Sequence, residues 1–591
     1  MSQSATADQH PDRVAVKGGE QYPPEASLKL NGPPGTGKTT QLLERVTRLL
    51  DSGVELNDIT FVTYRTEMAE EFLRRLRDRG YVTDEQIEEP WAHETRHFGT
   101  LHAVCNRITI DAQTVENKHR RHFLWDEYKV QYDGRRADLD TETDFSAKVG
   151  SLVFDAYSWC IENKQFSFPR FPGYMEIKDE WPNCPSFQEF DKAWTDYKED
   201  GGTDGAQLQD FEDMLRKVDV QNLAAPGDIL IVDEYHDFTP IMASIVNGWM
   251  DRKDTVIVGA DPLQAIYSYK GASPEFYRQL DLPEILLDRT YRVPSNVWEY
   301  ARGVIDHTPP DIEPNRDGGK VTAAKGTPKD VVDKYGSEGS LMFLARTKSQ
   351  VRDISNKLKE AGVVFRSQKR AGGWNHSTKR LPLYNALQKI RDVRPVESVN
   401  PSTGQTGMNR YTDEDVEKGV RIPSAVELTP SEMKALVRFT PAEYFTTTKK
   451  SLKTVPDSQP VVTGDDLLQH VEPSFWGDMT NGSQSVQNLL SYDAKDIIKR
   501  ALIRNDEPFD SIATADIPDV MTIHASKGKE ADTVALYDGI PPAVQKDTRR
   551  DERKQRAESR VWYVGVTRAA ENLLVFRDEY DYCDPILPSI R

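Results

Sequence analysis

Residues 32–39 constrain this chain more than any other part of its sequence. They have the pattern G-x-x-x-x-G-K-T and lie between a short apolar segment, 26–30, and a segment with apolar residues at helical spacing, 41–50. A strand, a glycine-rich loop and a helix in this order bind phosphate, because loop N–H groups and the positive end of the helix dipole face the anion. A glycine-rich turn without a nucleotide is the alternative, and the Lys-Thr pair argues against it. The sequence therefore predicts a chain that binds ATP or a close relative.

The side chains of this loop have distinct expected roles. Lys38 is expected to reach the β- and γ-phosphates, and the Thr39 hydroxyl is expected to bind Mg²⁺. The residues expected to surround the nucleotide are those of the loop and the first helical positions: Gly32, Pro33, Pro34, Gly35, Thr36, Gly37, Lys38, Thr39 and Thr40.

A second segment favours ATP hydrolysis over mere binding. Residues 229–232 are a short apolar run of the kind that forms a buried parallel strand, and Asp233 and Glu234 follow directly. Carboxylates at the C-terminal end of such a strand lie where α/β sheets bind ligands. Asp233 is expected to hold Mg²⁺, directly or through water, and Glu234 to act as general base toward the attacking water.

Composition sets the broad class of the protein. At 591 residues the chain is too long for one hydrophobic core, so several domains are expected. No apolar run approaches the roughly 18 residues that cross a membrane, and residues 1–13 are polar. We therefore expect a cytoplasmic protein without membrane contact and with a flexible tail at 1–13. The four cysteines lack metal-ligand spacing, which predicts neither zinc nor an iron–sulfur cluster.

The net charge of −19 is a property of the whole surface, and taken alone it argues against a polyanionic partner. A nucleic-acid groove needs local positive potential, which the charge of the whole chain does not report. Nucleic acid therefore stays among the expected partners.

Motifs from residue 32 to residue 569 resemble those of superfamily 1 helicases of the UvrD/Rep/PcrA type, and they follow in that family's order. The acidic strand end continues as Asp-Glu-Tyr-His-Asp, which is similar to the family's D-E-x-Q-D element. Residues 563–569 read Tyr-Val-Gly-Val-Thr-Arg-Ala, as in the family. The other matching segments are 62–66, 99–102, 210–215, 261–272, 287–292 and 522–530.

The resemblance implies an α/β fold with two RecA-like P-loop cores, each built on a parallel sheet and each carrying a mainly helical insertion. The expected boundaries are 14–102 and 208–285 for the first core, 103–207 for its insertion, 286–395 and 515–591 for the second core, and 396–514 for the second insertion.

In this family ATP lies between the cores, and the second core supplies arginines. Cations aimed at the γ-phosphate lower the barrier to phosphoryl transfer. Tyr291 corresponds to the residue that stacks on adenine, and Glu530 to the residue that accepts a hydrogen bond from ribose. The resemblance implies catalytic roles, with Gln264 as γ-phosphate sensor, for Lys38, Glu234, Gln264, Arg292 and Arg568.

Further matches indicate single-stranded DNA as a partner. Aromatic rings suit a translocase because stacking on bases tolerates any sequence. Tyr269, where the family has Trp, is the strongest match; a lone Tyr otherwise packs in a core more often than it stacks on a base. The expected DNA contacts are Tyr64, Thr66, Thr100, His102, Tyr267, Tyr269, Thr522 and His524.

The chain departs from the family pattern at several positions. His236 stands where the family has Gln, Lys270 where it has Arg, and Thr290 where it has Asn. The family's upstream adenine-reading Gln has no clear counterpart, because two prolines follow Gln21 where a helix is expected. The choice of nucleotide therefore stays open.

The leading interpretation is an Mg²⁺- and ATP-dependent 3′-to-5′ DNA helicase or translocase of DNA repair or replication. It is expected to act on single-stranded DNA and duplex junctions, and its polarity is carried over from the family. Two alternatives stay open: a superfamily 1 helicase of opposite polarity or RNA preference, and a nucleotide-switched protein that remodels a partner without unwinding. The sequence identifies no loading or repair partner.

Overall fold

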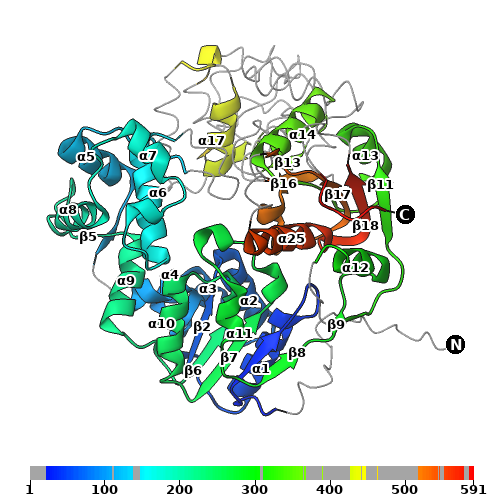
Figure 1. Ribbon diagram of the computed structural model, residues 1–591, viewed down its shortest axis with the longest axis horizontal. Coiled ribbons are helices and arrows are strands. Elements are labelled where there is room, and N and C mark those ends of the chain that lie inside the picture. Colours follow the sequence, from blue (N-terminus) through cyan, green and yellow to red (C-terminus); the bar gives the residue numbers. More distant parts are fainter. Residues whose placement is uncertain are drawn as a thin grey trace, which may run out of the picture.

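Two α/β lobes make up the body of the protein in the computed structural model (Figure 1). The structure describes residues 22–109, 112–136, 147–305, 311–361, 363, 365–367, 386, 389, 426–440, 442–446, 462–463, 471, 517–542, 545, 551–577 and 585–590. The predicted tail at 1–13 and most of the predicted second insertion, 396–514, lie outside these residues.

The first lobe is built on a six-stranded sheet whose neighbouring strands are all parallel. Its strands in spatial order are β3 (Phe98–Thr100), β2 (Ile59–Thr63), β6 (Ile229–Val232), β7 (Thr255–Ala260), β1 (Leu28–Asn31) and β8 (Glu284–Leu286). Strands β1 and β6 flank β7 and run in the same direction. The glycine-rich loop after β1 and the carboxylates after β6 therefore lie on the same side of the sheet, at the carboxyl ends of its strands.

Helices cover both faces of this sheet, which explains why its central strands are continuous apolar runs. In β6, the side chains of Ile229 and Ile231 pack in the hydrophobic cluster on one face of the sheet, and those of Leu230 and Val232 pack in the cluster on the other face. The cluster on the Ile229 face also contains residues of α1 (Lys38–Asp51) and α2 (Thr66–Asp78). The cluster on the Leu230 face also contains residues of α4 (Leu101–Thr109), α9 (Phe211–Gln221) and α10 (Pro240–Met250).

The second lobe repeats this architecture. Its six-stranded parallel sheet has the order β11 (Lys320–Ala324), β18 (Ala569–Phe576), β17 (Ala531–Tyr537), β12 (Leu341–Ala345), β16 (Asp519–Thr522) and β13 (Arg366–Ser367). One face packs on α12 (Ser295–Arg302) and α25 (Glu552–Val566), and the other on α13 (Pro328–Tyr335) and α14 (Lys348–Glu360). The α/β class with two parallel-sheet cores is thus confirmed.

A short parallel ribbon lies on the path between the lobes. It pairs β9 (Arg289–Thr290) with β10 (Glu313–Pro314), and in Figure 1 β9 follows directly on the edge strand β8 of the first sheet. Helix α25 of the second lobe faces the first lobe in the same view. Residues 289–292, 524–527 and 560–568 therefore approach the first lobe.

A helical subdomain projects from the first lobe, at the left of Figure 1. It contains α5 (Asn117–Tyr128), α6 (Val149–Glu162), α7 (Tyr174–Glu180) and α8 (Phe187–Glu199), and β4 (Gln113–Thr114) pairs with β5 (Leu208–Gln209) at its base. Its core is aromatic: the rings of Phe123, Phe154, Phe190 and Trp194 contact one another. The exact domain boundaries stay a prediction.

The described part of the second insertion is small. It includes α17 (Pro430–Phe439) and an antiparallel pair of β14 (Glu427–Leu428) with β15 (Val462–Thr463). Among the residues that the structure describes, none of the helices combines the length and the apolar character needed to span a bilayer.

Candidate active site

The glycine-rich loop adopts a backbone shape that needs its glycines. Gly35 has a φ of +73° and Gly37 a φ of +79°, in the left-handed region that side chains disfavour. At Gly32 an added Cβ would lie 2.7 Å from the Cβ of Lys38. Helix α1 begins at Lys38, and its N-cap Gly37 has no side chain to cap the first turn. The free N–H groups of that turn face the loop, as an anion site requires.

The side chains at the start of α1 meet the carboxylates that follow β6. The Lys38 ammonium contacts the Glu234 carboxylate and lies 3.1 Å from Asp233 Oδ1. The Thr39 hydroxyl donates to Asp233 Oδ2 at 3.0 Å. Burial lowers the pKa of Lys38, but Asp233 and Glu234 raise it further, so that the net pKa lies above the ordinary value and the ammonium stays charged. Oxygen ligands for Mg²⁺ and a phosphate-binding cation are thereby gathered at one point.

Glu234 has an unusual backbone conformation. Its φ of 57° is left-handed for a residue that is not glycine, a cost of about 1–2 kcal/mol. Its N–H donates to Asp233 Oδ1 at 2.9 Å, which holds the two neighbouring carboxylates in fixed relation. Burial raises the pKa of Glu234, but the neighbouring Lys38, His236 and Lys527 together outweigh burial and bring the pKa below its ordinary value. The carboxylate is therefore ionised, as a proton acceptor must be.

Arginines of the second lobe approach this loop. An added Cβ at Gly35 would lie 2.5 Å from the Cβ of Arg292, so the two backbones are in close contact. Arg292 Nη1 lies 3.2 Å from Glu530 Oε2, and its buried Nε has no hydrogen-bond partner among the described residues. Arg568 is buried, and its Nη2 donates to Gln264 Oε1 at 3.1 Å. Burial, and then the charge of Arg292, lower the pKa of Arg568 to about 9.

These contacts describe a site that favours an anion. Two guanidinium groups repel each other across it, and beside the loop lies the buried Arg292 Nε, which has no partner in the part of the chain that the structure describes. A triphosphate would relieve both unfavourable features. The residues present therefore fit Mg²⁺ and a triphosphate, with Thr39 and Asp233 as metal-binding residues and Lys38, Arg292 and Arg568 as cations toward the phosphates.

The segment before Arg292 binds directly to the loop. Thr290 donates from its hydroxyl to the carbonyl oxygen of Pro34 at 2.7 Å, and the N–H of Tyr291 donates to the carbonyl oxygen of Gly35 at 2.9 Å. Thr290 is the residue that departs from the family's Asn. Its short side chain still supplies a donor to the loop, which gives the departure a structural explanation.

Four of the predicted DNA-contact side chains form one cluster. Ring centroids lie 5.3 Å apart for Tyr64 and Tyr267, 6.2 Å for Tyr267 and Tyr269, and 5.9 Å for Tyr269 and His524. Tyr267 is only 9% exposed, so most of its ring is packed against neighbours. Lys270, which replaces the family's Arg, lies 5.9 Å from the Tyr64 ring centroid and donates to its hydroxyl at 3.3 Å.

The other predicted DNA contacts have different neighbours. His102 packs against the half-exposed ring of Phe211, with centroids 6.0 Å apart, and burial lowers its pKa to about 4. Thr100 and Thr522 accept hydrogen bonds from backbone N–H groups at the start of helical turns, and Thr66 is the exposed first residue of α2. Their DNA-binding roles stay predictions.

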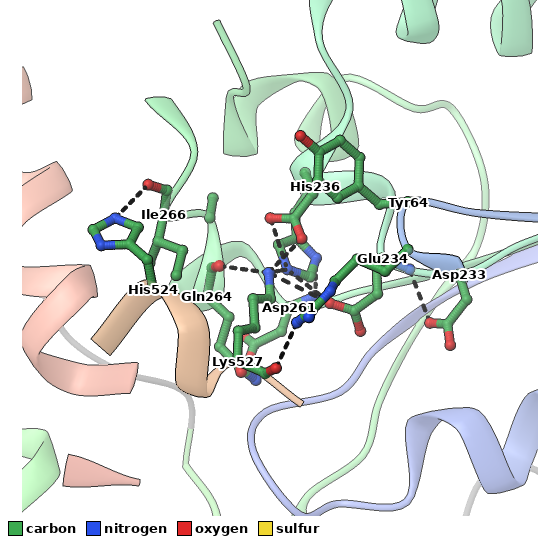
Figure 2. A network of polar contacts seen from close by, with 12 residues as sticks. Tyr64, Asp233, Glu234, His236, Asp261, Gln264, Ile266, His524 and Lys527 are labelled. Carbon is green, nitrogen blue, oxygen red and sulfur yellow. Dashed lines mark hydrogen bonds and ion pairs between the residues drawn. The ribbon is translucent and has the colours of Figure 1, made fainter. Parts of the chain in front are cut away.

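Side chains of the second lobe also donate hydrogen bonds to three consecutive carbonyl groups of the first lobe. The carbonyl oxygens of residues 264, 265 and 266 accept hydrogen bonds from Lys527 at 2.9 Å, Arg560 at 2.9 Å and His524 at 3.2 Å. Figure 2 shows Lys527 and His524 reaching this strip from one side. Sequence reasoning assigned no role to Lys527 or Arg560. For Lys527 a signal was available, since it is the lysine of the T-x-H-x-x-K-G-x-E pattern at 522–530.

Comparison with known proteins follows the same division into lobes. The UvrD/REP helicase N-terminal domain family matches residues 20–283, and the UvrD-like helicase C-terminal domain family matches residues 476–579. The "ATP-dependent DNA helicase UvrD2" of Mycobacterium bovis is 26% identical over 232 residues, which are 32% of this chain and 32% of that protein. This chain thus matches about a third of the length of UvrD2.

Two further relatives match more of the chain. The "ATP-dependent DNA helicase PcrA" of Leuconostoc citreum is 22% identical over 625 residues, covering 93% of this chain and 80% of that protein. The "DNA helicase IV" of Escherichia coli is 24% identical over 333 residues, covering 49% of this chain and 46% of that protein.

Proposed function

Because this chain belongs to the UvrD/REP helicase family, we propose that it is a cytoplasmic, Mg²⁺- and ATP-dependent DNA helicase that moves 3′-to-5′ along single-stranded DNA and unwinds duplex junctions. The observation that supports the proposal best is the approach of second-lobe arginines to the first lobe, where Arg292 lies against the glycine-rich loop and Arg568 donates to Gln264. The names of the relatives support DNA as the substrate.

Each residue of the site has a task that its position allows. Thr39 and Asp233 would hold Mg²⁺, which would supply positive charge to the phosphate oxygens. Lys38 binds the terminal phosphates, and the ionised Glu234 accepts the proton of the attacking water. Tyr291 and Glu530 contact the base and the ribose.

The second lobe completes the charge stabilisation. Arg292 and Arg568 neutralise negative charge that develops on the γ-phosphate oxygens. Gln264, whose amide lies between Arg568 and Asp261, relays the state of the phosphate to the segment 261–272. Hydrolysis then depends on lobe closure.

Dependence on closure is what turns nucleotide state into movement along DNA. The rings of Tyr64 and Tyr269 come from the first lobe, and the ring of His524 comes from the second. A change in the distance between the lobes alters the spacing of these rings, so that the protein releases one base and stacks on the next.

The proposal is tested by ATP turnover and strand displacement on 3′-tailed, 5′-tailed and blunt DNA duplexes, and on tailed RNA, over a range of salt. Salt is varied because phosphate contacts make affinity fall steeply with ionic strength. We expect single-stranded DNA to stimulate turnover and the 3′-tailed DNA to be unwound. Unwinding of only the 5′-tailed or RNA substrates would indicate the corresponding alternative helicase, and turnover indifferent to DNA would indicate a nucleotide-switched remodelling protein.

A further inference from the structure

Lys527 of the second lobe inserts its side chain into the acidic element of the first lobe (Figure 2). Its Nζ lies 2.5 Å from Asp237 Oδ2, 2.9 Å from the carbonyl oxygen of Gln264 and 3.4 Å from Glu234 Oε2. The side chain is only 4% exposed. Three oxygen acceptors therefore surround the three protons of one buried ammonium.

The pocket that receives Lys527 belongs wholly to the first lobe. Ligand atoms of Glu234, His236 and Asp237 lie within 4.8 Å of one another, a grouping that can hold a metal ion. In this protein the Lys527 ammonium lies among them, so the cation of the pocket is a side chain of the other lobe. Buried carboxylates are costly without a paired cation, and this cation is supplied only when the lobes are together.

His236, which stands where the family has Gln, lines one side of the pocket. It is fully buried, and the N–H of Asp261 donates to its Nδ1 at 2.9 Å. Burial lowers the pKa of His236 well below its usual range, so the ring is neutral. Nε2 lies 3.3 Å from Glu234 Oε2 and 2.8 Å from Lys527 Nζ. His236 and Lys527 thus contact each other beside the same Glu234 oxygen.

The two oxygens of Glu234 consequently face lysines of different lobes. Lys38, next to the phosphate loop, contacts Oε1, while Lys527 lies closer to Oε2. Lys527 also links this carboxylate to the predicted DNA cluster. Its Nζ lies 5.5 Å from the Tyr267 ring centroid, and its carbonyl oxygen accepts from Arg65 Nη1 at 2.7 Å.

We propose that Lys527 is a positioning residue that orients the Glu234 carboxylate and the Gln264 main chain when the lobes close, and so couples DNA contact to ATP hydrolysis. The inference rests on the proposed function and deepens it. Lys527 touches neither nucleotide nor DNA in this account. Replacing Lys527 must therefore change the rate of ATP turnover and the stimulation of that rate by DNA, and leave the affinities for nucleotide and DNA unchanged.

The test compares Lys527→Met with wild type and with Lys325→Met, which removes an exposed lysine of the same lobe. Steady-state ATP turnover is measured with and without oligo-dT, and binding of ATPγS and of oligo-dT is measured separately. Removing a partner that orients a functional group typically costs about 10–100-fold in activity. We expect that loss in DNA-stimulated kcat for Lys527→Met, a smaller ratio of stimulated to unstimulated turnover, and both affinities within about threefold of wild type, as a positioning role requires. Lys527→Arg, which keeps the charge, should recover part of the ratio.

Asp237→Asn provides a second variant of unchanged size should Lys527→Met not fold, as judged by its thermal melt. It weakens the partner of the ammonium, and we expect it to lower the same ratio by about tenfold. An unchanged ratio in the folded variant, or a parallel loss of turnover and ATPγS affinity, would overturn the inference. If wild type itself is not stimulated by oligo-dT, the proposed function fails instead, so the two failures are distinguishable.

Discussion

Replacement of Arg568 tests the contribution of the second lobe to hydrolysis. The guanidinium group is held through all three of its nitrogens. Nε donates to the carbonyl oxygen of Val564 at 2.9 Å, Nη1 to that of Lys529 at 3.2 Å, and Nη2 to Gln264 Oε1 at 3.1 Å. Lysine has a single terminal nitrogen and cannot occupy this fork. We therefore expect Arg568→Lys to lose most of the function even though the charge remains.

The size of the effect follows from the arrangement of cations. An arginine supplied to a transferring phosphoryl group contributes about 10³–10⁵ in rate. Arg292 and Lys38 remain in Arg568→Ala, so we expect the lower end of this range. A loss of about 10³ in kcat corresponds to roughly 4 kcal/mol of transition-state stabilisation. Affinity for the ground-state nucleotide should change by less than about tenfold, because the contact is made chiefly in the transition state.

The assay is steady-state phosphate release at saturating oligo-dT, with ATPγS binding measured in parallel. Arg302→Ala is the control, since Arg302 is an exposed arginine at the end of α12 in the same lobe. Thermal unfolding must show that Arg568→Ala is folded, because Arg568 is fully buried. A folded Arg568→Ala with kcat within tenfold of wild type would refute the assignment.

Three further perturbations have defined outcomes. Glu234→Gln should lower DNA-stimulated kcat by about 10²–10⁴ while ATPγS still binds, and ordinary phosphate release would refute Glu234 as the base. Tyr269→Ala should weaken oligo-dT binding by about 1–3 kcal/mol in fluorescence anisotropy, with ATPγS affinity unchanged; equal losses of both affinities would indicate a folding defect. Lys198→Met should lower the free energy of unfolding by about 3–5 kcal/mol, because it leaves Asp210 and Asp213 buried without the ammonium that lies 3.0 Å and 2.5 Å from them. Urea unfolding measures the last effect, and a change below about 1 kcal/mol would contradict it.

Local patterns predicted the strands beside the glycine-rich loop and the carboxylates, and the family resemblance supplied the two-core fold class. The apolar run at 229–232 is β6 as expected, and the strand predicted at 26–30 lies at 28–31, shifted because the last residue, Asn31, extends the pairing with β7 and β8. Both are short runs buried on two faces, which a parallel sheet requires. The order of the motifs then predicted a second core of the same kind.

Contacts between the lobes could not be predicted in this way. Periodicity reports which face of one element is buried, and it carries no distance between elements. Lys527 and Asp237 are 290 positions apart in the sequence, and only the three-dimensional structure brings them together. The same limit applies to Thr290, whose partner Pro34 lies 256 positions away, and to Tyr267, whose ring packs between neighbours from both lobes.

The central claim is that arginines of the second lobe reach a triphosphate bound by the first. A crystal structure of the protein with Mg²⁺, a non-hydrolysable ATP analogue and oligo-dT tests it directly. The account predicts the γ-phosphate between Lys38 and the guanidinium groups of Arg292 and Arg568, each within hydrogen-bonding distance. A γ-phosphate contacted by first-lobe residues alone, with both arginines directed elsewhere, would contradict it.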